Sequence, residues 1–108
     1  MKPTKYRSRT AVVDGKKFQS RKESARYVEL RLLERAGAIS GLELQPVYVL
    51  APAVVIGGRK KPALRYSPDF RYVKHGETVI EDVKGVLTPV FRIKQHLMAV
   101  AGYEIRLV

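Results

Sequence analysis

Two helix signals, one near each end of the chain, enclose a long stretch of short β-prone segments. Ser20 and Glu23 have the spacing of a capping box, and Thr88 followed by a proline is typical of the first turn of a second helix. Glycines beyond each periodic segment supply the C-terminal stops, so the sequence predicts helices over residues 21–36 and 89–101. With strands between the helices, the expected fold class is α/β.

Short extended segments account for the remainder of the predicted structure. Asp14-Gly15 suits a tight two-residue turn, which predicts a short hairpin before the first helix. Later strands are predicted over residues 42–50, 64–73, 78–84 and 103–108, with residues 54–56 extending the hairpin that joins the first two. Short turns favour an antiparallel meander for the three central strands, whereas the second helix would return the last strand parallel to a neighbour. The resulting order is a hairpin followed by α-β-β-β-α-β.

The balance of charge indicates the class of partner. Lys and Arg number 21 while Asp and Glu number 10, which gives a formal net charge of +11. A chain of this charge attracts phosphate backbones through counterion release, so nucleic acid is the expected partner. The cations expected to contact it are Lys5, Arg7, Arg9, Lys16, Lys17, Arg21, Lys22, Arg59, Lys60, Lys61 and Lys94.

Length and composition limit the organisation of the chain. Its 108 residues suffice for one core, so we expect a single domain over residues 10–108, preceded by a basic flexible arm at residues 1–9. The absence of cysteine excludes disulfides and Cys-based zinc sites. The sequence shows neither the apolar core of a signal peptide nor an apolar run of about 20 residues. We therefore expect a soluble, cytoplasmic protein with no membrane partner.

Two carboxylates and a lysine on neighbouring predicted strands indicate hydrolytic chemistry. Asp69 follows Pro68 within one strand, and Asp82 precedes Lys84 by two residues in the next. Side chains two apart in a strand share a face, so Asp82 and Lys84 should project together. Carboxylate oxygens suit Mg²⁺, and a nearby ammonium can hold the attacking water or offset charge on a phosphate. The pattern suits a metal-dependent phosphodiesterase, in which Mn²⁺ should substitute for Mg²⁺.

Several of these residues also have purely structural interpretations. Asp82 and Lys84 could form a surface ion pair, and Glu23 could serve only as a helix cap. Glu81 competes with Asp82 as the motif acid, although it should lie on the face opposite Lys84, so the choice between the two stays open. Gln45 could be a buried amide bonded to main chain or could position a water molecule.

The element order, with Pro68-Asp69 on one strand and Asp82-Val83-Lys84 on the next, resembles the PD-(D/E)xK nuclease superfamily. The segments at residues 18–23, 42–46 and 81–85 look like those of small phage-encoded endonucleases of the Holliday junction resolvase type. The resemblance implies a restriction-endonuclease-like αβββαβ core with a mixed central sheet, preceded by a short N-terminal β-hairpin.

The resemblance also implies a role for each site residue. Lys84 would be the lysine of the motif, and Gln45 fits a polar position found in some relatives. The implied metal ligands are the carboxylates of Asp69, Asp82 and Glu23 and the main-chain carbonyl of Val83.

By the same resemblance, the expected function is Mg²⁺-dependent endonucleolytic hydrolysis of DNA by a structure-specific Holliday junction resolvase. Two nicks across a four-way junction require two sites, so a homodimer is expected. Such a protein would be a phage or prophage product acting inside a bacterial host. The alternatives are a phage or transposon endonuclease that cuts duplex or flap DNA, and a basic nucleic-acid-binding module without catalysis. The clustered acids argue against the last alternative, because they repel a polyanion unless a cation intervenes.

Overall fold

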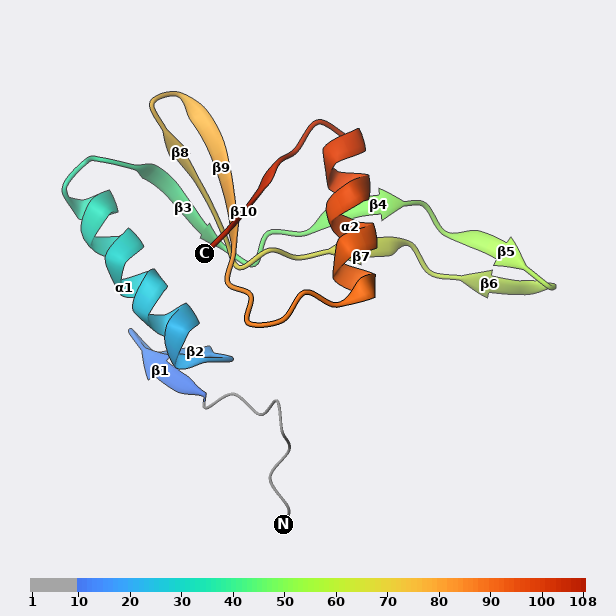
Figure 1. Cartoon of the computed structure of the whole chain (residues 1–108), viewed down its shortest axis with the longest axis horizontal. Helices are drawn as coiled ribbons and strands as arrows, with labels where there is room; N and C mark the ends of the chain where they lie inside the picture. Colours follow the sequence, from blue (N-terminus) through green and yellow to red (C-terminus); the bar gives the residue numbers. More distant parts are fainter. Residues whose placement is uncertain (1–9) are drawn as a thin grey trace, which may run out of the picture.

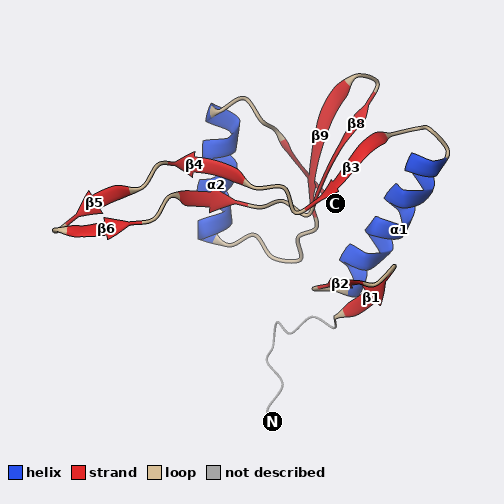
Figure 2. Ribbon diagram, turned by 180° about the vertical axis from the view of Figure 1, so that it is seen from behind, coloured by secondary structure: helices blue, strands red, loops and turns tan. Residues whose placement is uncertain are grey.

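The structure is a computed structural model that describes residues 10–108 as an α/β fold with two helices and a mixed four-stranded sheet (Figure 1). The basic arm expected at residues 1–9, with Lys5, Arg7 and Arg9, lies outside the described residues. The elements in chain order are β1 (Ala11–Val13), β2 (Lys16–Phe18), α1 (Arg21–Arg35), β3 (Ser40–Leu44), β4 (Tyr48–Ala51), β5 (Val54–Ile56), β6 (Arg59–Lys61), β7 (Leu64–Tyr66), β8 (Phe70–Lys74), β9 (Glu77–Asp82), α2 (Pro89–Val100) and β10 (Ile105–Leu107). Seen from the front and from behind, the two helices lie on either side of the sheet (Figures 1 and 2).

The local signals at the helix ends act as the sequence predicts. The hydroxyl of Ser20 accepts a hydrogen bond of 3.1 Å from the main-chain N–H of Glu23, which begins α1. Thr88 caps α2 in the same way through the N–H of Phe91, also at 3.1 Å. Gly37 adopts a φ of +80° just beyond α1, a conformation that favours glycine and ends the helix. Both predicted helices and the β1–β2 hairpin are confirmed.

The central sheet has the strand order β10-β9-β8-β3. Strands β3, β8 and β9 pair antiparallel, and β10 pairs parallel with β9 after the crossover through α2. The expected meander and the expected parallel last strand are therefore both confirmed. This topology places the start of β8 beside the end of β9, because Phe70 is the register partner of Glu81.

Alternation along the central strands divides the core into two halves. Phe70 and Tyr72 of β8 are buried against α1, where they join Leu30. Ile80 of β9 belongs to a second cluster, which includes Met98 of α2. Neighbouring positions in a strand point to opposite faces, so each helix covers one face of the sheet.

Two of the predicted strands are broken, and the breaks create a projecting ribbon. The strand predicted over residues 42–50 is interrupted after β3, where Gln45 adopts a φ of +50°, and the strand predicted over residues 64–73 is interrupted between β7 and β8. The inner halves β3 and β8 stay in the central sheet, while β4 pairs with β7 and β5 pairs with β6. We call residues 48–66 the β-arm; it extends away from the sheet beyond α2 (Figure 1).

The same breaks correct the expected positions of two site residues. Asp69 lies in a bend immediately before β8 and not inside a strand. The strand predicted over residues 78–84 would have ended at Lys84, but β9 ends at Asp82, so Lys84 lies beyond the strand. Within residues 10–108, no helix is long and apolar enough to cross a membrane.

Candidate active site

Two aspartates meet where β8 begins and β9 ends. The main-chain N–H of Val83 donates a hydrogen bond of 2.7 Å to Oδ2 of Asp69, which holds this carboxylate beside the end of β9. The main-chain carbonyl of Asp69 in turn accepts a 3.0 Å hydrogen bond from the N–H of Gln45. The bend that carries Asp69 is therefore fixed from both neighbouring strands. Asp69 and Asp82 become close neighbours although they are separated in sequence.

Asp82 is buried, and a neutral donor and a cationic donor both contact its carboxylate. The hydroxyl of Tyr66 donates a hydrogen bond to Oδ2 of Asp82, and Nζ of Lys84 lies 3.4 Å from the same oxygen. The main-chain carbonyl of Asp82 accepts a 3.1 Å hydrogen bond from the N–H of Val108. Asp82 and Lys84 thus project to the same side of the chain. The lysine is partly exposed, with a side chain that is 30% accessible, so its ammonium remains available to a ligand in the adjoining cleft.

Glu23 brings a third carboxylate to the same place from α1. Its side chain is only 6% exposed although its N–H serves the helix cap. Burial raises the pKa of Glu23, a main-chain hydrogen bond at Gln19 lowers it, and the charge of Asp82 raises it further. Glu23 contributes to the helix cap through its main-chain N–H, while its carboxylate lines the same cleft as the two aspartates.

The environment of Asp69 disfavours a bare negative charge. Burial is the largest cause, and a hydrogen bond and repulsion from Asp82 add to it, against the lowering effect of the Val83 N–H; together they raise the pKa of Asp69 to about 7. Two adjacent carboxylates cannot both ionise freely without a compensating cation. Lys84 supplies only part of that compensation, since it lies on the Asp82 side.

The acidic side chains open into one cleft of about 410 Å³. Its lining combines the N-terminal turn of α1 with the segment that follows β9. The lining residues are Gln19, Ser20, Lys22, Glu23, Asp69, Asp82, Val83, Lys84 and Gly85. The cleft thus contains three carboxylates and two lysines.

The donor set of this cleft fits a hydrated hard cation. Within residues 10–108 no three His, Cys, Asp or Glu side chains form a group that could hold a metal ion. Mg²⁺ keeps several of its waters and takes only one or two carboxylates, which matches the Asp69 and Asp82 pair. Val83 follows Asp82 directly and lines the cleft, as the implied main-chain ligand would.

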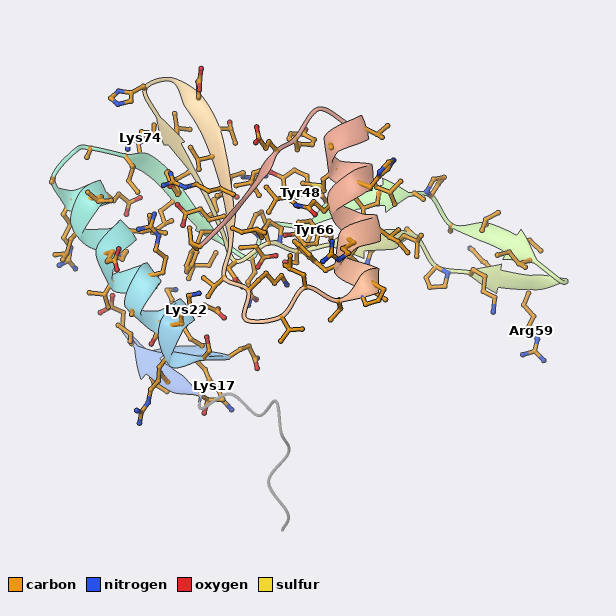
Figure 3. All side chains as sticks on the ribbon, viewed as in Figure 1. Lys17, Lys22, Tyr48, Arg59, Tyr66 and Lys74 are labelled. Carbon is orange, nitrogen blue, oxygen red and sulfur yellow. The ribbon has the colours of Figure 1, made fainter. Side chains whose placement is uncertain are left out.

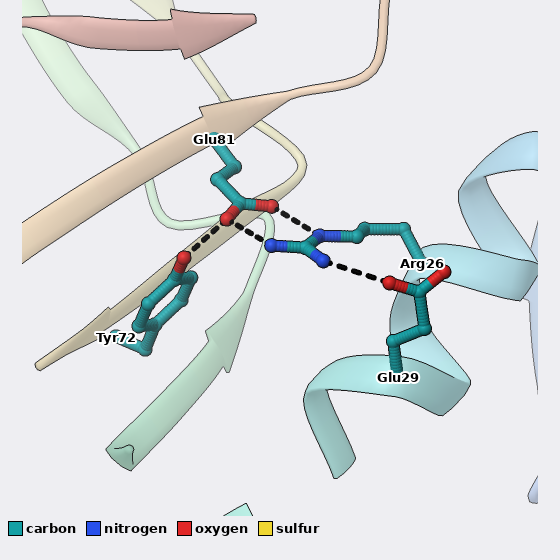
Figure 4. A network of polar contacts seen from close by, with 4 residues as sticks. All are labelled: Arg26, Glu29, Tyr72 and Glu81. Atoms are coloured by element: carbon teal, nitrogen blue, oxygen red, sulfur yellow. Dashed lines mark hydrogen bonds and ion pairs between the residues drawn. The ribbon is translucent and has the colours of Figure 1, made fainter. Parts of the chain in front are cut away.

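Glu81, the competing acid, points to the other face of β9. Its carboxylate is fully buried and receives two hydrogen bonds from Arg26, of 2.8 Å from Nε and 2.6 Å from Nη2 (Figure 4). The hydroxyl of Tyr72 donates a further bond, and Arg26 also contacts Glu29 at 2.9 Å. Burial by itself would raise the pKa of Glu81, but the bonds from Arg26 and Tyr72 outweigh it and lower the pKa. Glu81 thus ties α1 to the sheet, whereas Asp82 faces the cleft.

The remaining candidates divide between the cleft and more distant surfaces. Gln45 is exposed, so its interpretation as a buried amide is wrong; it lines a hollow of about 210 Å³ that also includes Glu23 and Asp69. Lys17 and Lys22 lie near the beginning of α1, whereas Arg59 lies at the far tip of the β-arm (Figure 3). The cations expected to bind nucleic acid that line the cleft or an adjoining hollow are Lys16, Lys17, Lys22 and Lys94. Arg21 is exposed at the start of α1, and Lys60 and Lys61 accompany Arg59 in β6.

Sequence reasoning missed Tyr66 and Arg26, which hold the two neighbouring acids. Tyr66 contacts Asp82 across 16 residues of sequence, and Arg26 contacts Glu81 across 55. No local pattern reports such contacts.

Comparison with known proteins identifies the family of the chain. Residues 3–108 match the DUF1064 family, which is described as a protein of unknown function. No curated protein and no solved structure matches the chain. Since the match covers almost the whole sequence, the chain belongs to the DUF1064 family.

Proposed function

We propose that the chain is a Mg²⁺-dependent DNA endonuclease of the PD-(D/E)xK type. The observation that carries this proposal is that Asp69, Asp82 and Glu23, from three separate parts of the chain, line one cleft with Lys84. The strand order β10-β9-β8-β3, with the acids at the start of β8 and the end of β9, is compatible with a restriction-endonuclease-like core. An acidic cleft in a chain of net charge +11 is understandable if a cation joins it to a phosphate.

In the proposed reaction, a water oxygen bonds to phosphorus and gives up a proton to solvent. The bond from phosphorus to the leaving-group oxygen of the cut strand breaks, and that oxygen takes up a proton from solvent. Asp69 and Asp82, with the carbonyl of Val83, would hold Mg²⁺ directly and Glu23 would hold it through a bound water, since the ion keeps part of its water shell; Mn²⁺ should substitute. The bound ion would activate the water and polarise the phosphate. Lys84, with its ammonium 3.4 Å from Asp82, would position the water and offset the charge that develops on the phosphoryl oxygens. Tyr66 orients Asp82 through its hydrogen bond to Oδ2.

The proposed substrate is branched DNA, in particular a four-way junction, on the strength of the resemblance to resolvases. Symmetric nicking of two strands calls for two sites related by a two-fold axis, hence a homodimer. A cleavage assay on four-way junction, flap, duplex and single-stranded DNA, with and without Mg²⁺, tests the proposal. Junction cleavage that requires Mg²⁺, by a protein that sediments as a dimer, is the expected result. A monomer that cuts duplex and junction equally would leave a nuclease but not a resolvase.

Asp82→Asn is the variant that isolates the chemistry. It should abolish cleavage while DNA binding persists or becomes tighter, because the variant loses metal affinity and one negative charge together. Glu77→Gln is the matched control, since Glu77 is an exposed acid at the opposite end of β9. Normal turnover by Asp82→Asn, or cleavage that is unaffected by EDTA, would overturn the metal-dependent mechanism. A wild-type protein that binds DNA and cuts none of the four substrates would support the binding-module alternative.

A further inference from the structure

The cleft adjoins three other hollows: one beside β2, one beside α2, and one lined by Arg26 and Arg106. On one side it shares Glu23 and Asp69 with a hollow of about 210 Å³ beside β2. On the other side it shares Lys84 with a hollow of about 530 Å³ between the base of the β-arm and α2. The cleft, the β2 hollow and the α2 hollow therefore lie next to one another, and we call the three together the active-site groove.

Charge is distributed along this groove in a definite order. Lys16 and Lys17 line the hollow beside β2, and Arg65 and Lys94 line the hollow beside α2. No acidic side chain lines the α2 hollow. The carboxylates lie only in the central cleft and at its border with the β2 hollow. A polyanion placed along the groove would therefore meet cations at both ends and the acids only at its centre.

Two of the three cations that line the α2 hollow, Arg65 and Lys94, have no ion-pair partner in the described part of the chain; the third, Lys84, pairs with Asp82. An arginine and a lysine that converge on one hollow without a carboxylate are suited to phosphate, which each can contact through its N–H donors. The hydroxyls of Ser67 and Thr88 line the same hollow and add neutral donors.

Apolar side chains complete the α2 hollow. Val47 and Val90 are each 62% exposed although they line it. Phe91 forms its floor, with Nζ of Lys84 lying 4.6 Å from the ring centroid. A nucleotide suits such a lining, because its sugar and base can contact the exposed apolar side chains while its phosphate contacts the neighbouring cations.

We infer that one strand of the nucleic acid lies along the active-site groove, from Lys16 and Lys17, over the aspartates, to a phosphate-binding end formed by Arg65 and Lys94. This inference rests on the proposed function for the identity of the central site. It adds Arg65 as a substrate-binding residue, and it separates the groove from the cations of β6 at the tip of the β-arm (Figure 3).

The test compares two doubly substituted full-length proteins of equal charge. Arg65→Ala/Lys94→Ala removes the cations of the groove end. Arg35→Ala/Lys74→Ala removes one arginine and one lysine from exposed positions at the end of α1 and the end of β8, which do not line the groove. Binding of four-way-junction and duplex DNA is measured in EDTA over a range of salt concentrations, so that no cleavage occurs. Urea unfolding of each protein establishes that it is folded.

The groove variant should bind both DNAs about tenfold more weakly than wild type, and the slope of log K against log salt should fall by about 1.8 for two lost phosphate contacts. The control should keep the wild-type slope. An unchanged slope in the groove variant, or an equal loss in the control, would overturn the inference. If the wild type cuts DNA with Mg²⁺ while the groove variant binds normally, the groove is wrong and the nuclease stands. If the groove variant loses binding while the wild type cuts nothing, the groove stands and the nuclease is wrong.

Discussion

Replacing Asp69 by asparagine should make the metal-free protein more stable at about pH 8. The carboxylate of Asp69 is crowded by burial and by Asp82, which raises its pKa from 3.8 to about 7. At about 1.4 kcal/mol per pKa unit, holding this group ionised in the fold corresponds to about 4 kcal/mol. Because the group is partly exposed and shares its charge with Asp82, we expect about 1–3 kcal/mol of that to be recovered. Asparagine keeps an oxygen to accept the hydrogen bond from Val83.

The free energy of unfolding of the wild type should fall with rising pH because the fold raises the pKa of Asp69. Between about pH 4 and 7 the folded protein retains a proton on Asp69 that the unfolded chain releases, so the wild type has its full stability below about pH 4 and loses part of it by about pH 7. Asp69→Asn lacks this loss. The stability difference between the two proteins should therefore grow between about pH 4 and 7 and level off near pH 8.

Urea unfolding followed by circular dichroism, in EDTA and again with saturating Mg²⁺, measures the effect. The wild type should gain stability with Mg²⁺, whereas Asp69→Asn should gain little, since it has lost a ligand. Glu77→Gln, at an exposed acid of β9, serves as the control and should change neither quantity. The reasoning is refuted if Asp69→Asn is less stable than wild type in EDTA at about pH 8, or if the difference does not vary with pH.

Two further substitutions separate catalysis from structure on either side of β9. Lys84→Ala should slow the chemical step by about 10²-fold, the scale of losing one group that stabilises transition-state charge, while Mn²⁺ affinity measured by calorimetry persists. A collapse of Mn²⁺ affinity would contradict a role confined to the water and the phosphate. Glu81→Gln should instead lower the free energy of unfolding by about 3 kcal/mol, because the guanidinium of Arg26 loses its buried partner. Its cleavage rate per folded molecule should stay near wild type; if Glu81→Gln is folded but inactive, the two acids of the pair have been assigned to the wrong roles.

Local sequence patterns predicted which helices and strands are present better than where the strands begin and end. The caps at Ser20 and Thr88 involve residues three apart, so their hydrogen bonds could be foreseen from sequence. The short turns likewise predicted the antiparallel meander. The breaks near Gln45 and Asp69 could not be foreseen, because each depends on the other: the N–H of Gln45 bonds to the carbonyl of Asp69 across the two strands.

The candidate site shows the same division between local and distant contacts. Alternation within β9 correctly predicted that Glu81 lies opposite Asp82. Asp82 and Lys84 share a side as predicted, although Lys84 lies beyond the end of the strand, so strand alternation is not the reason. Alternation could not reveal what stabilises the buried carboxylate of Glu81, because its partner Arg26 comes from α1. The contact of Tyr66 with Asp82 likewise forms only when the strands and helices pack together, so no local pattern predicts it.

The β-arm gives the molecule regions of unequal local stability. All six residues of β5 and β6 are exposed, and these strands pair only with each other, so the outer arm opens at little free-energy cost compared with the central sheet. A backbone break at the arm tip would leave β3 in one fragment and β8 in the other, and these are adjacent strands of one sheet. The two fragments would remain joined by that strand pairing and by the α1 core, so chain continuity at the tip is not what holds the candidate active site together.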